Sequence, residues 1–113
     1  MSLDFTLDLH TTLEDGTRGP DYNTFDGNVT HNLTGMWSEA GIYDVLYNTE
    51  GEQIGIYLDK LASALEDMRR YPDKYKEHSP INGWGTYEGA IRFLEALVKS
   101  AQEWPQARIH IWK

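Results

Sequence analysis

The residues best suited to chemistry lie between Asn28 and Asn32, where a histidine stands among amide and hydroxyl side chains in the order Asn-Val-Thr-His-Asn. This polar, turn-forming run is followed by an apolar pattern typical of a helix. The first backbone N–H groups of a helix have no partner inside it, so they and nearby side chains can hold a polar or anionic ligand. We therefore take Asn28, Thr30, His31 and Asn32 as candidate ligand-binding residues.

His31 has two other interpretations. It can be a structural residue that hydrogen-bonds within the fold. Alternatively, in a metal-dependent hydrolase, it would bind a metal ion together with acids from residues 14–26. None of the histidines stands at a spacing typical of metal ligands, so we assign no metal ligand, and the sequence implies no particular cofactor; the other three histidines are His10, His78 and His110.

The second candidate motif is Asn-Gly-Trp-Gly-Thr-Tyr-Glu-Gly at residues 82–89, just before a helical pattern. An indole ring can stack on a ligand while N–H groups at the helix start hold an anion. The structural alternative, which we favour for the turn itself, is a pair of glycines at positive φ, a packed tryptophan and a capping threonine. The candidate ligand-binding residues here are Trp84, Thr86, Tyr87 and Glu88.

Glu88 has two further interpretations. Paired with an acid from residues 14–26, it would serve general acid–base chemistry. The dipole of the following helix explains an acid in the first turn equally well. The sequence shows no phosphate loop and no nucleophile elbow. We therefore assign no catalytic residue, and the sequence favours a binding protein over an enzyme.

Strict alternation of apolar and polar residues predicts a half-buried strand at each end of the chain, over residues 3–9 and 107–112. The outward residues of the first strand are acidic and those of the last are basic. Because opposite charges across a ladder are favourable, we expect the two terminal strands to pair. Two strands alone are marginal, so helices must cover their apolar face.

Three helical stripes lie between these strands. The first begins near Thr30–Asn32, with one of those residues as its N-cap, and reaches about Tyr47, although two glycines weaken it. The second ends before Pro72, which opens a short helix at residues 73–77. The third starts after an N-cap at Thr86 and stops at Trp104-Pro105. The second and third stripes cover residues 54–68 and 87–101.

Residues 10–32 form a long connection rich in turn-forming residues, of a length that is usually functional or disordered. As an alternative, Asp15-Gly16 is the tip of a hairpin with a short second strand near residues 18–25. Together these patterns predict one α+β domain, residues 1–113. Three main helices pack on a small antiparallel sheet that contains both terminal strands.

Composition restricts the function further. The net charge is −8, and residues 1–54 hold ten acids and a single base, Arg18. This acidity argues against non-specific nucleic-acid binding and suits a basic protein partner. The chain has no cysteine, no apolar run long enough for a membrane span and no leader pattern. We therefore expect a cytoplasmic protein, with a homodimer formed through an exposed sheet edge as an open alternative.

The chain resembles a group of small uncharacterised proteins from bacteriophages and bacteria. The shared residues are the motifs at 28–32 and 82–89, a methionine at Met36, Ala-Gly-Ile-Tyr at 40–43 and Pro-x-Ala at 105–107. The resemblance spans about residues 23–112. It implies no known activity, but it suggests that the two motifs belong together.

Two functions follow as expectations. In the first, the two turns converge at two helix starts and bind an unknown small polar ligand. His31 and Asn32 hydrogen-bond this ligand, Trp84 stacks on it and Glu88 orients it. In the second, the acidic front half makes the protein an interaction factor for a basic protein, such as a phage-encoded modulator of a host protein.

Overall fold

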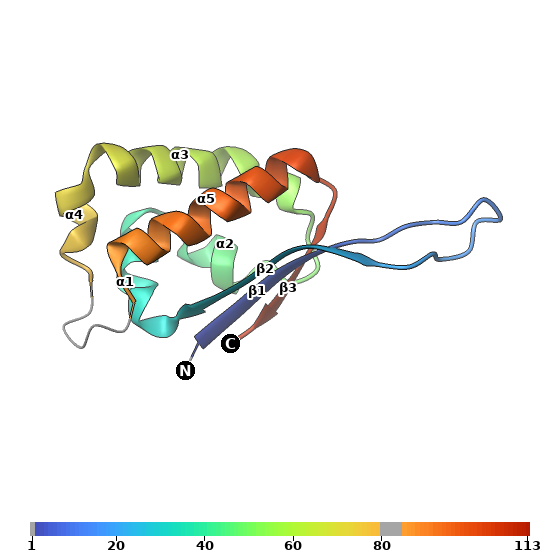
Figure 1. Ribbon diagram of the computed structural model, residues 1–113, viewed down its shortest axis with the longest axis horizontal. Helices are drawn as coiled ribbons and strands as arrows, with labels where there is room; N and C mark the ends of the chain where they lie inside the picture. Colours follow the sequence, from blue (N-terminus) through green and yellow to red (C-terminus); the bar gives the residue numbers. More distant parts are fainter. Residues whose placement is uncertain (1, 80–84) are drawn as a thin grey trace.

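A computed structural model describes residues 2–79 and 85–113. A three-stranded antiparallel sheet in the order β2-β1-β3 lies under a layer of helices (Figure 1). The strands are β1 (Ser2–Leu9), β2 (Tyr22–Thr30) and β3 (Arg108–Trp112). The predicted α+β class is confirmed, including the presence of both terminal strands in the sheet.

Strand β1 lies in the middle and pairs antiparallel with both neighbours. Its alternating apolar side chains Leu3, Phe5 and Leu7 are fully buried against the helices. The predicted pairing of the termini is confirmed, with Leu7 opposite Ile109 and Asp8 opposite Arg108. The alternation therefore fixes which face of the sheet meets the core.

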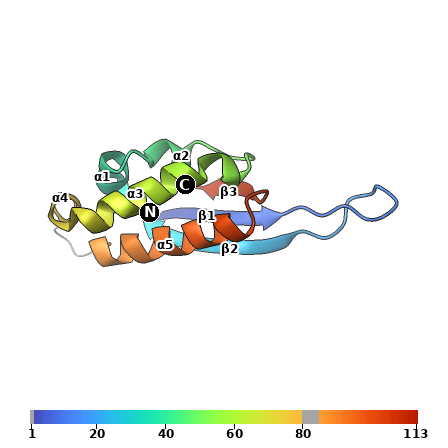
Figure 2. The same cartoon turned by 90° about the horizontal axis from the view of Figure 1, so that it is seen from above.

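Two long helices form most of the covering layer. They are α3 (Leu58–Arg70) and α5 (Tyr87–Glu103), which lie side by side with α5 also against β2 (Figure 2). The 3₁₀ helix η2 (Ile54–Tyr57) leads into α3, and the short α4 (Pro72–Lys76) follows it, as predicted. Among the residues described, no helix combines the length and apolar character needed to cross a bilayer.

The first predicted helix, from Thr30–Asn32 to Tyr47, is wrong as a single element. It consists of the 3₁₀ helix η1 (His31–Leu33), α1 (Thr34–Glu39) and α2 (Tyr43–Tyr47). Gly41 has φ +77° and donates its N–H to Ser38, while the N–H of Ile42 bonds to the carbonyl of Trp37. This is a Schellman ending, in which a glycine in the left-handed region closes the helix.

Residues 10–32 are also not one long connection. The hairpin alternative is confirmed in outline, but the second strand begins at Tyr22 and extends to Thr30. Asn28 and Thr30 are therefore strand residues, because pairing with the apolar strand β1 outweighs the turn-forming composition of this segment. We call residues 10–21, which connect β1 and β2, the arm.

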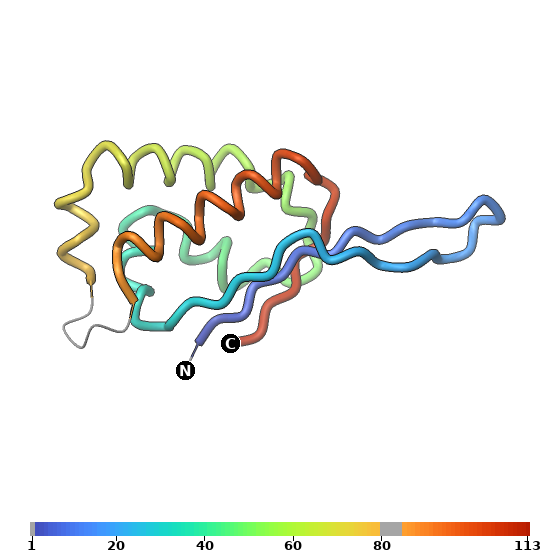
Figure 3. The backbone as a smooth tube through the Cα atoms, viewed as in Figure 1, coloured from blue at the N-terminus to red at the C-terminus, as the bar shows by residue number. Residues whose placement is uncertain are grey.

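The arm projects from one end of the body, and the molecule is 54 Å long but only 28 and 19 Å across (Figures 1 and 3). Two backbone hydrogen bonds close the turn at its tip, from the Leu13 N–H to the Thr17 carbonyl (2.7 Å) and from the Gly16 N–H to the Leu13 carbonyl (2.9 Å). Gly16 has φ +87°, which a glycine adopts without strain. Thr12 and Arg18 form a further antiparallel bridge.

The outer edge of β3 is covered by residues 50–53. The N–H of Ile109 bonds to the Glu52 carbonyl (2.9 Å), and the N–H of Gly51 bonds to the Ile109 carbonyl (2.8 Å). The carboxylate of Glu50 accepts the N–H of Ile111 at 2.8 Å. This edge therefore has its backbone groups occupied, which removes a common route to edge-to-edge association.

A substitution at Gly27 in β2 tests how closely the sheet packs against α5. A Cβ atom at this position would lie 2.5 Å from the ring of Phe93 and 2.8 Å from that of Phe25, two aromatic side chains that pack edge to face. We expect Gly27→Ala to lower the free energy of unfolding by about 1–3 kcal/mol because the core becomes overpacked. Urea denaturation measures the change.

The matched control is Asp26→Ala, one position along the same strand with its side chain exposed. It is expected to change stability by less than about 0.5 kcal/mol. Equal effects of the two substitutions would contradict the close packing at Gly27.

Candidate functional site

The two sequence motifs meet at one surface hollow of about 330 Å³. The end of β2 and η1 form one wall, and the start of α5 forms the other; the lining residues are Asn28, Val29, Thr30, Leu33, Gly85, Thr86 and Gly89. The structure thus brings together three of the predicted ligand-binding residues, Asn28, Thr30 and Thr86.

Gly85 explains why the two walls approach so closely. It has φ +92°, and a Cβ atom there would lie 2.6 Å from the Thr30 methyl carbon and 3.2 Å from the Leu33 side chain. Only a glycine fits both the backbone angle and the space. The glycine that the sequence places before this helix therefore has a structural role.

The polar groups around the hollow are engaged within the protein. The Thr30 hydroxyl accepts the N–H of Asn32 (3.2 Å), and the Thr86 hydroxyl accepts the N–H of Gly89 (3.0 Å), so both threonines are N-caps as predicted. The Asn28 amide donates to the carboxylate of Asp4 at 2.7 Å. A ligand in the hollow would have to share or displace these bonds.

His31 does not line this hollow. Its Nδ1 lies 2.9 Å from the hydroxyl of Tyr47, and its half-buried ring packs beside the tyrosine ring. Tyr47 in turn stacks on Tyr43 with ring centroids 4.6 Å apart, and burial raises the pKa of Tyr47. The geometry agrees with the structural interpretation of His31, which joins η1 to α2.

The remaining predicted residues are dispersed. Asn32 and Glu88 are exposed and do not line the hollow. The hydroxyl of Tyr87 donates to the carbonyl of Met68 at 2.6 Å and so links α5 to α3, and burial raises the pKa of this tyrosine. Trp84 lies outside the described residues, as do Asn82 and Gly83.

The predicted pairing of Glu88 with an acid from residues 14–26 is not formed with the two acids at the tip of the arm. Glu88 lies in the first turn of α5, at the opposite end of the molecule from Glu14 and Asp15 (Figure 1). Within residues 2–79 and 85–113, no three or more His, Asp or Glu side chains are arranged to hold a metal ion. A hydrolase that uses His31 with acids from residues 14–26 therefore has no geometric support among the described residues.

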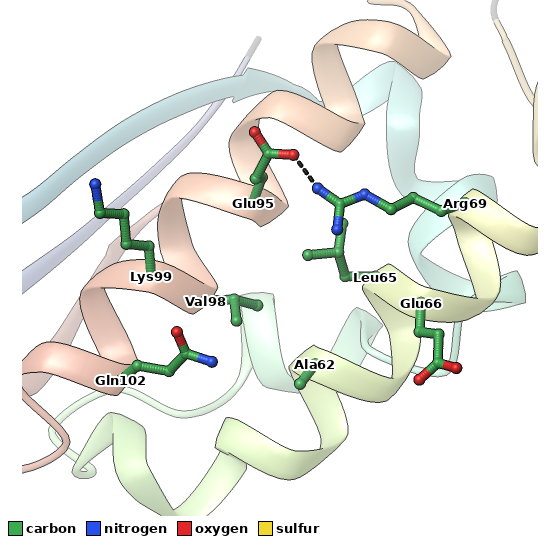
Figure 4. A pocket seen from close by; sticks show the side chains of 8 residues that line it. All are labelled: Ala62, Leu65, Glu66, Arg69, Glu95, Val98, Lys99 and Gln102. Atoms are coloured by element: carbon green, nitrogen blue, oxygen red, sulfur yellow. Dashed lines mark hydrogen bonds and ion pairs between the residues drawn. The ribbon is translucent and has the colours of Figure 1, made fainter.

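A second hollow, of about 480 Å³, runs between α3 and α5 (Figure 4). Its floor is formed by Leu65 and Val98, and an ion pair between Arg69 and Glu95 bridges the two helices. The rest of the lining is Ala62 and the polar or charged side chains of Glu66, Lys99 and Gln102. The lining holds no histidine, serine or aromatic group, so we interpret it as the groove that two packed helices leave between them.

No protein-family model, curated protein or solved structure matches the chain. The resemblance to phage and bacterial proteins stays a prediction from the two motifs.

Apart from the acids of residues 14–26, the sequence predicts no functional residue in the arm. All side chains from Thr12 to Arg18 are exposed, and Leu13 at the tip is 51% exposed. Asp15-Gly16 is the turn signal from which the hairpin is predicted as an alternative. Nothing in the sequence alone shows that the hairpin extends beyond the body.

A partly buried hydrogen bond holds α4 against α3. Tyr75 is buried and its hydroxyl donates to the carboxylate of Asp67, to which Lys74 also donates at 3.3 Å. The bond from Tyr75 lowers the pKa of Asp67, and the ammonium group of Lys74 adds to this effect. Burial and the same bond raise the pKa of Tyr75.

These shifts predict a pH dependence of stability. Because the pKa of Asp67 is lower in the folded than in the unfolded state, its contribution is present above its ordinary value of 3.8 and is lost as the pH falls through the folded-state value. We expect Asp67→Asn to lose less stability than the wild type on acidification from about pH 5 to about pH 2. Urea denaturation at a series of pH values measures these slopes.

The control for this experiment is Asp73→Asn, which removes an exposed carboxylate from α4. It should follow the wild-type slope more closely. Identical slopes for wild type and Asp67→Asn would show that the bond to Tyr75 does not stabilise the fold.

Proposed function

We propose that this protein is an interaction factor that binds a basic protein partner through the arm and the adjoining open face of the sheet. The observation that carries the proposal is the projection of the arm, an ordered two-stranded extension with exposed side chains. Such an extension adds no buried core to a small domain, but it offers an exposed surface to which a partner can bind.

The charge of the hairpin formed by β1, the arm and β2 supports a basic partner. Residues 2–30 carry six acids and one base, Arg18. Arg18 is already paired with Asp21 at 2.7 Å, so the hairpin presents a largely uncompensated negative charge. Complementary charge steers association and selects partners more than it adds affinity.

Preorganisation supports the same conclusion. The arm is closed by backbone hydrogen bonds, and both the N–H and the hydroxyl of Thr17 donate to the Asp15 carboxylate (3.0 and 2.6 Å). A binding element that is ordered before association loses less conformational freedom on binding. A phage-encoded modulator of a host protein would use such a surface.

Charge reversal on the hairpin tests the proposal. We expect the double variant Glu14→Lys and Asp26→Lys to lose partners that the wild-type protein captures from a cell lysate at low salt. Capture by the wild type should fall steeply between about 50 and 200 mM salt because screening shortens the range of the attraction. Quantitative mass spectrometry of the captured proteins measures both effects.

The matched control is Asp73→Lys with Glu77→Lys, which changes the net charge equally in and beside α4, at the end of the body away from the arm. It should retain the partners. A lysate from which nothing is captured in a salt-sensitive manner, or equal losses in both variants, would contradict the proposal.

The hollow at the start of α5 supports a second candidate, the binding of a small polar or anionic ligand, because Asn28, Thr30 and Thr86 converge there. A ligand specific for the folded state should raise the melting temperature, with about 2.7 kcal/mol of stabilisation at a hundredfold excess over its dissociation constant. Asn28→Ala should remove the shift found in a thermal screen of nucleotides and metabolites.

Asn23→Ala is the matched control, because its amide also donates to a carboxylate of β1, that of Asp8 at 3.1 Å, but lies outside the hollow. A shift that survives in Asn28→Ala would place the ligand elsewhere. A screen without any shift would count against this candidate.

A further inference from the structure

Exposed apolar side chains gather at the end of the molecule that carries the arm. Leu13 and Tyr22 lie on the arm or at its base, while Ile56 (67% exposed) and Trp104 (42% exposed) lie on the body. η2, which contains Ile56, and the end of α5, which precedes Trp104, are both at the base of the arm (Figures 1 and 2). Exposed apolar groups on adjoining segments, as at Ile56 and Trp104, mark interaction surfaces more often than scattered ones do.

The two body segments are held firmly together. The Gly55 N–H donates to the Pro105 carbonyl at 2.8 Å, and the N–H of Ile54 donates to the Ala107 carbonyl at 2.9 Å. A Cβ atom at Gly55 would lie 2.7 Å from the Pro105 carbonyl oxygen, so the backbones touch. We call the exposed residues Ile56, Trp104 and Pro105 the end patch.

The two segments that carry the end patch have an excess of acids. Residues 50–60 and 102–108 hold the four acids Glu50, Glu52, Asp59 and Glu103 and the two bases Lys60 and Arg108, and the Arg108 guanidinium donates to the Gly51 carbonyl at 3.1 Å. The arm adds the carboxylates of Glu14 and Asp15. An apolar centre with a charged rim is the usual anatomy of a protein interface, and tryptophan is among the residues that contribute most to binding.

We infer that the end patch is the apolar half of the docking surface whose acidic half is the arm, and that its occupant is a basic amphipathic segment of the partner. This inference rests on the proposed function, which requires a basic partner but no apolar contact. Lysine or arginine side chains of the segment face the acids of the arm and rim, and its apolar side chains cover Ile56 and Trp104.

Two synthetic peptides of equal length and equal lysine content serve as probes. In one, leucines form a stripe at helical spacing; in the other, serines replace these leucines. We expect the leucine peptide to bind the full-length protein about tenfold more tightly in fluorescence anisotropy titrations, since a buried apolar anchor contributes at least 1.4 kcal/mol. The double variant Ile56→Ser and Trp104→Ser should remove this difference while residual salt-dependent binding remains.

The matched control is Tyr71→Ser with Trp112→Ser, which also removes two exposed aromatic or apolar groups but away from the arm. It should keep the preference for the leucine peptide, and circular dichroism should show that both double variants are folded. A preference that persists without Ile56 and Trp104, or that is lost in the control, overturns the inference.

The same titrations distinguish a failure of this inference from a failure of the proposed function. If both peptides bind equally and Glu14→Lys with Asp26→Lys weakens both, the acidic surface stands and the end patch has no part in docking. If neither peptide binds at low salt, the acidic surface itself does not recognise basic partners, and both proposals are wrong.

Discussion

The hydrogen bonding of β1 on both of its edges is the constraint on which the rest of the structure depends. β1 joins the two ends of the chain through β3 and carries the hairpin through β2. Its buried side chains Leu3, Phe5 and Leu7 fix the face on which the helices pack. Because the arm continues from β1 and β2, its direction is set by strands that the core holds in place.

The distribution of polar groups follows from the same constraint. With helices on one face and residues 50–53 along the β3 edge, the opposite face of the sheet carries acids and amides that bond to each other, such as Asn28 to Asp4. The polar residues near the start of α5 are likewise used as caps. Among the described residues, exposed apolar groups also lie at the tip of the arm and at its base, at Leu13, Tyr22, Ile56 and Trp104.

Much of the fold could be predicted from local pattern. The alternation of the terminal strands, the caps at Thr30 and Thr86 and the stripes of α3 and α5 depend on spacing along the chain. The division of the first predicted helix is local and follows from the ending at Gly41, whereas two other differences depend on contacts between distant residues. β2 is a strand only because β1 lies beside it, and the role of His31 depends on Tyr47, sixteen residues away. The meeting of Asn28, Thr30 and Thr86 at one hollow likewise depends on how the strand end and helix start pack.

The most direct test of this structure is whether the arm is an ordered hairpin in the free protein. Solution NMR of the full-length chain can detect cross-strand contacts between Thr12 and Arg18 and the backbone order of residues 10–21. If the arm is ordered, we expect those contacts together with backbone order parameters of about 0.85, as in a rigid backbone. Random-coil chemical shifts and order parameters below about 0.6 would contradict a preformed binding arm.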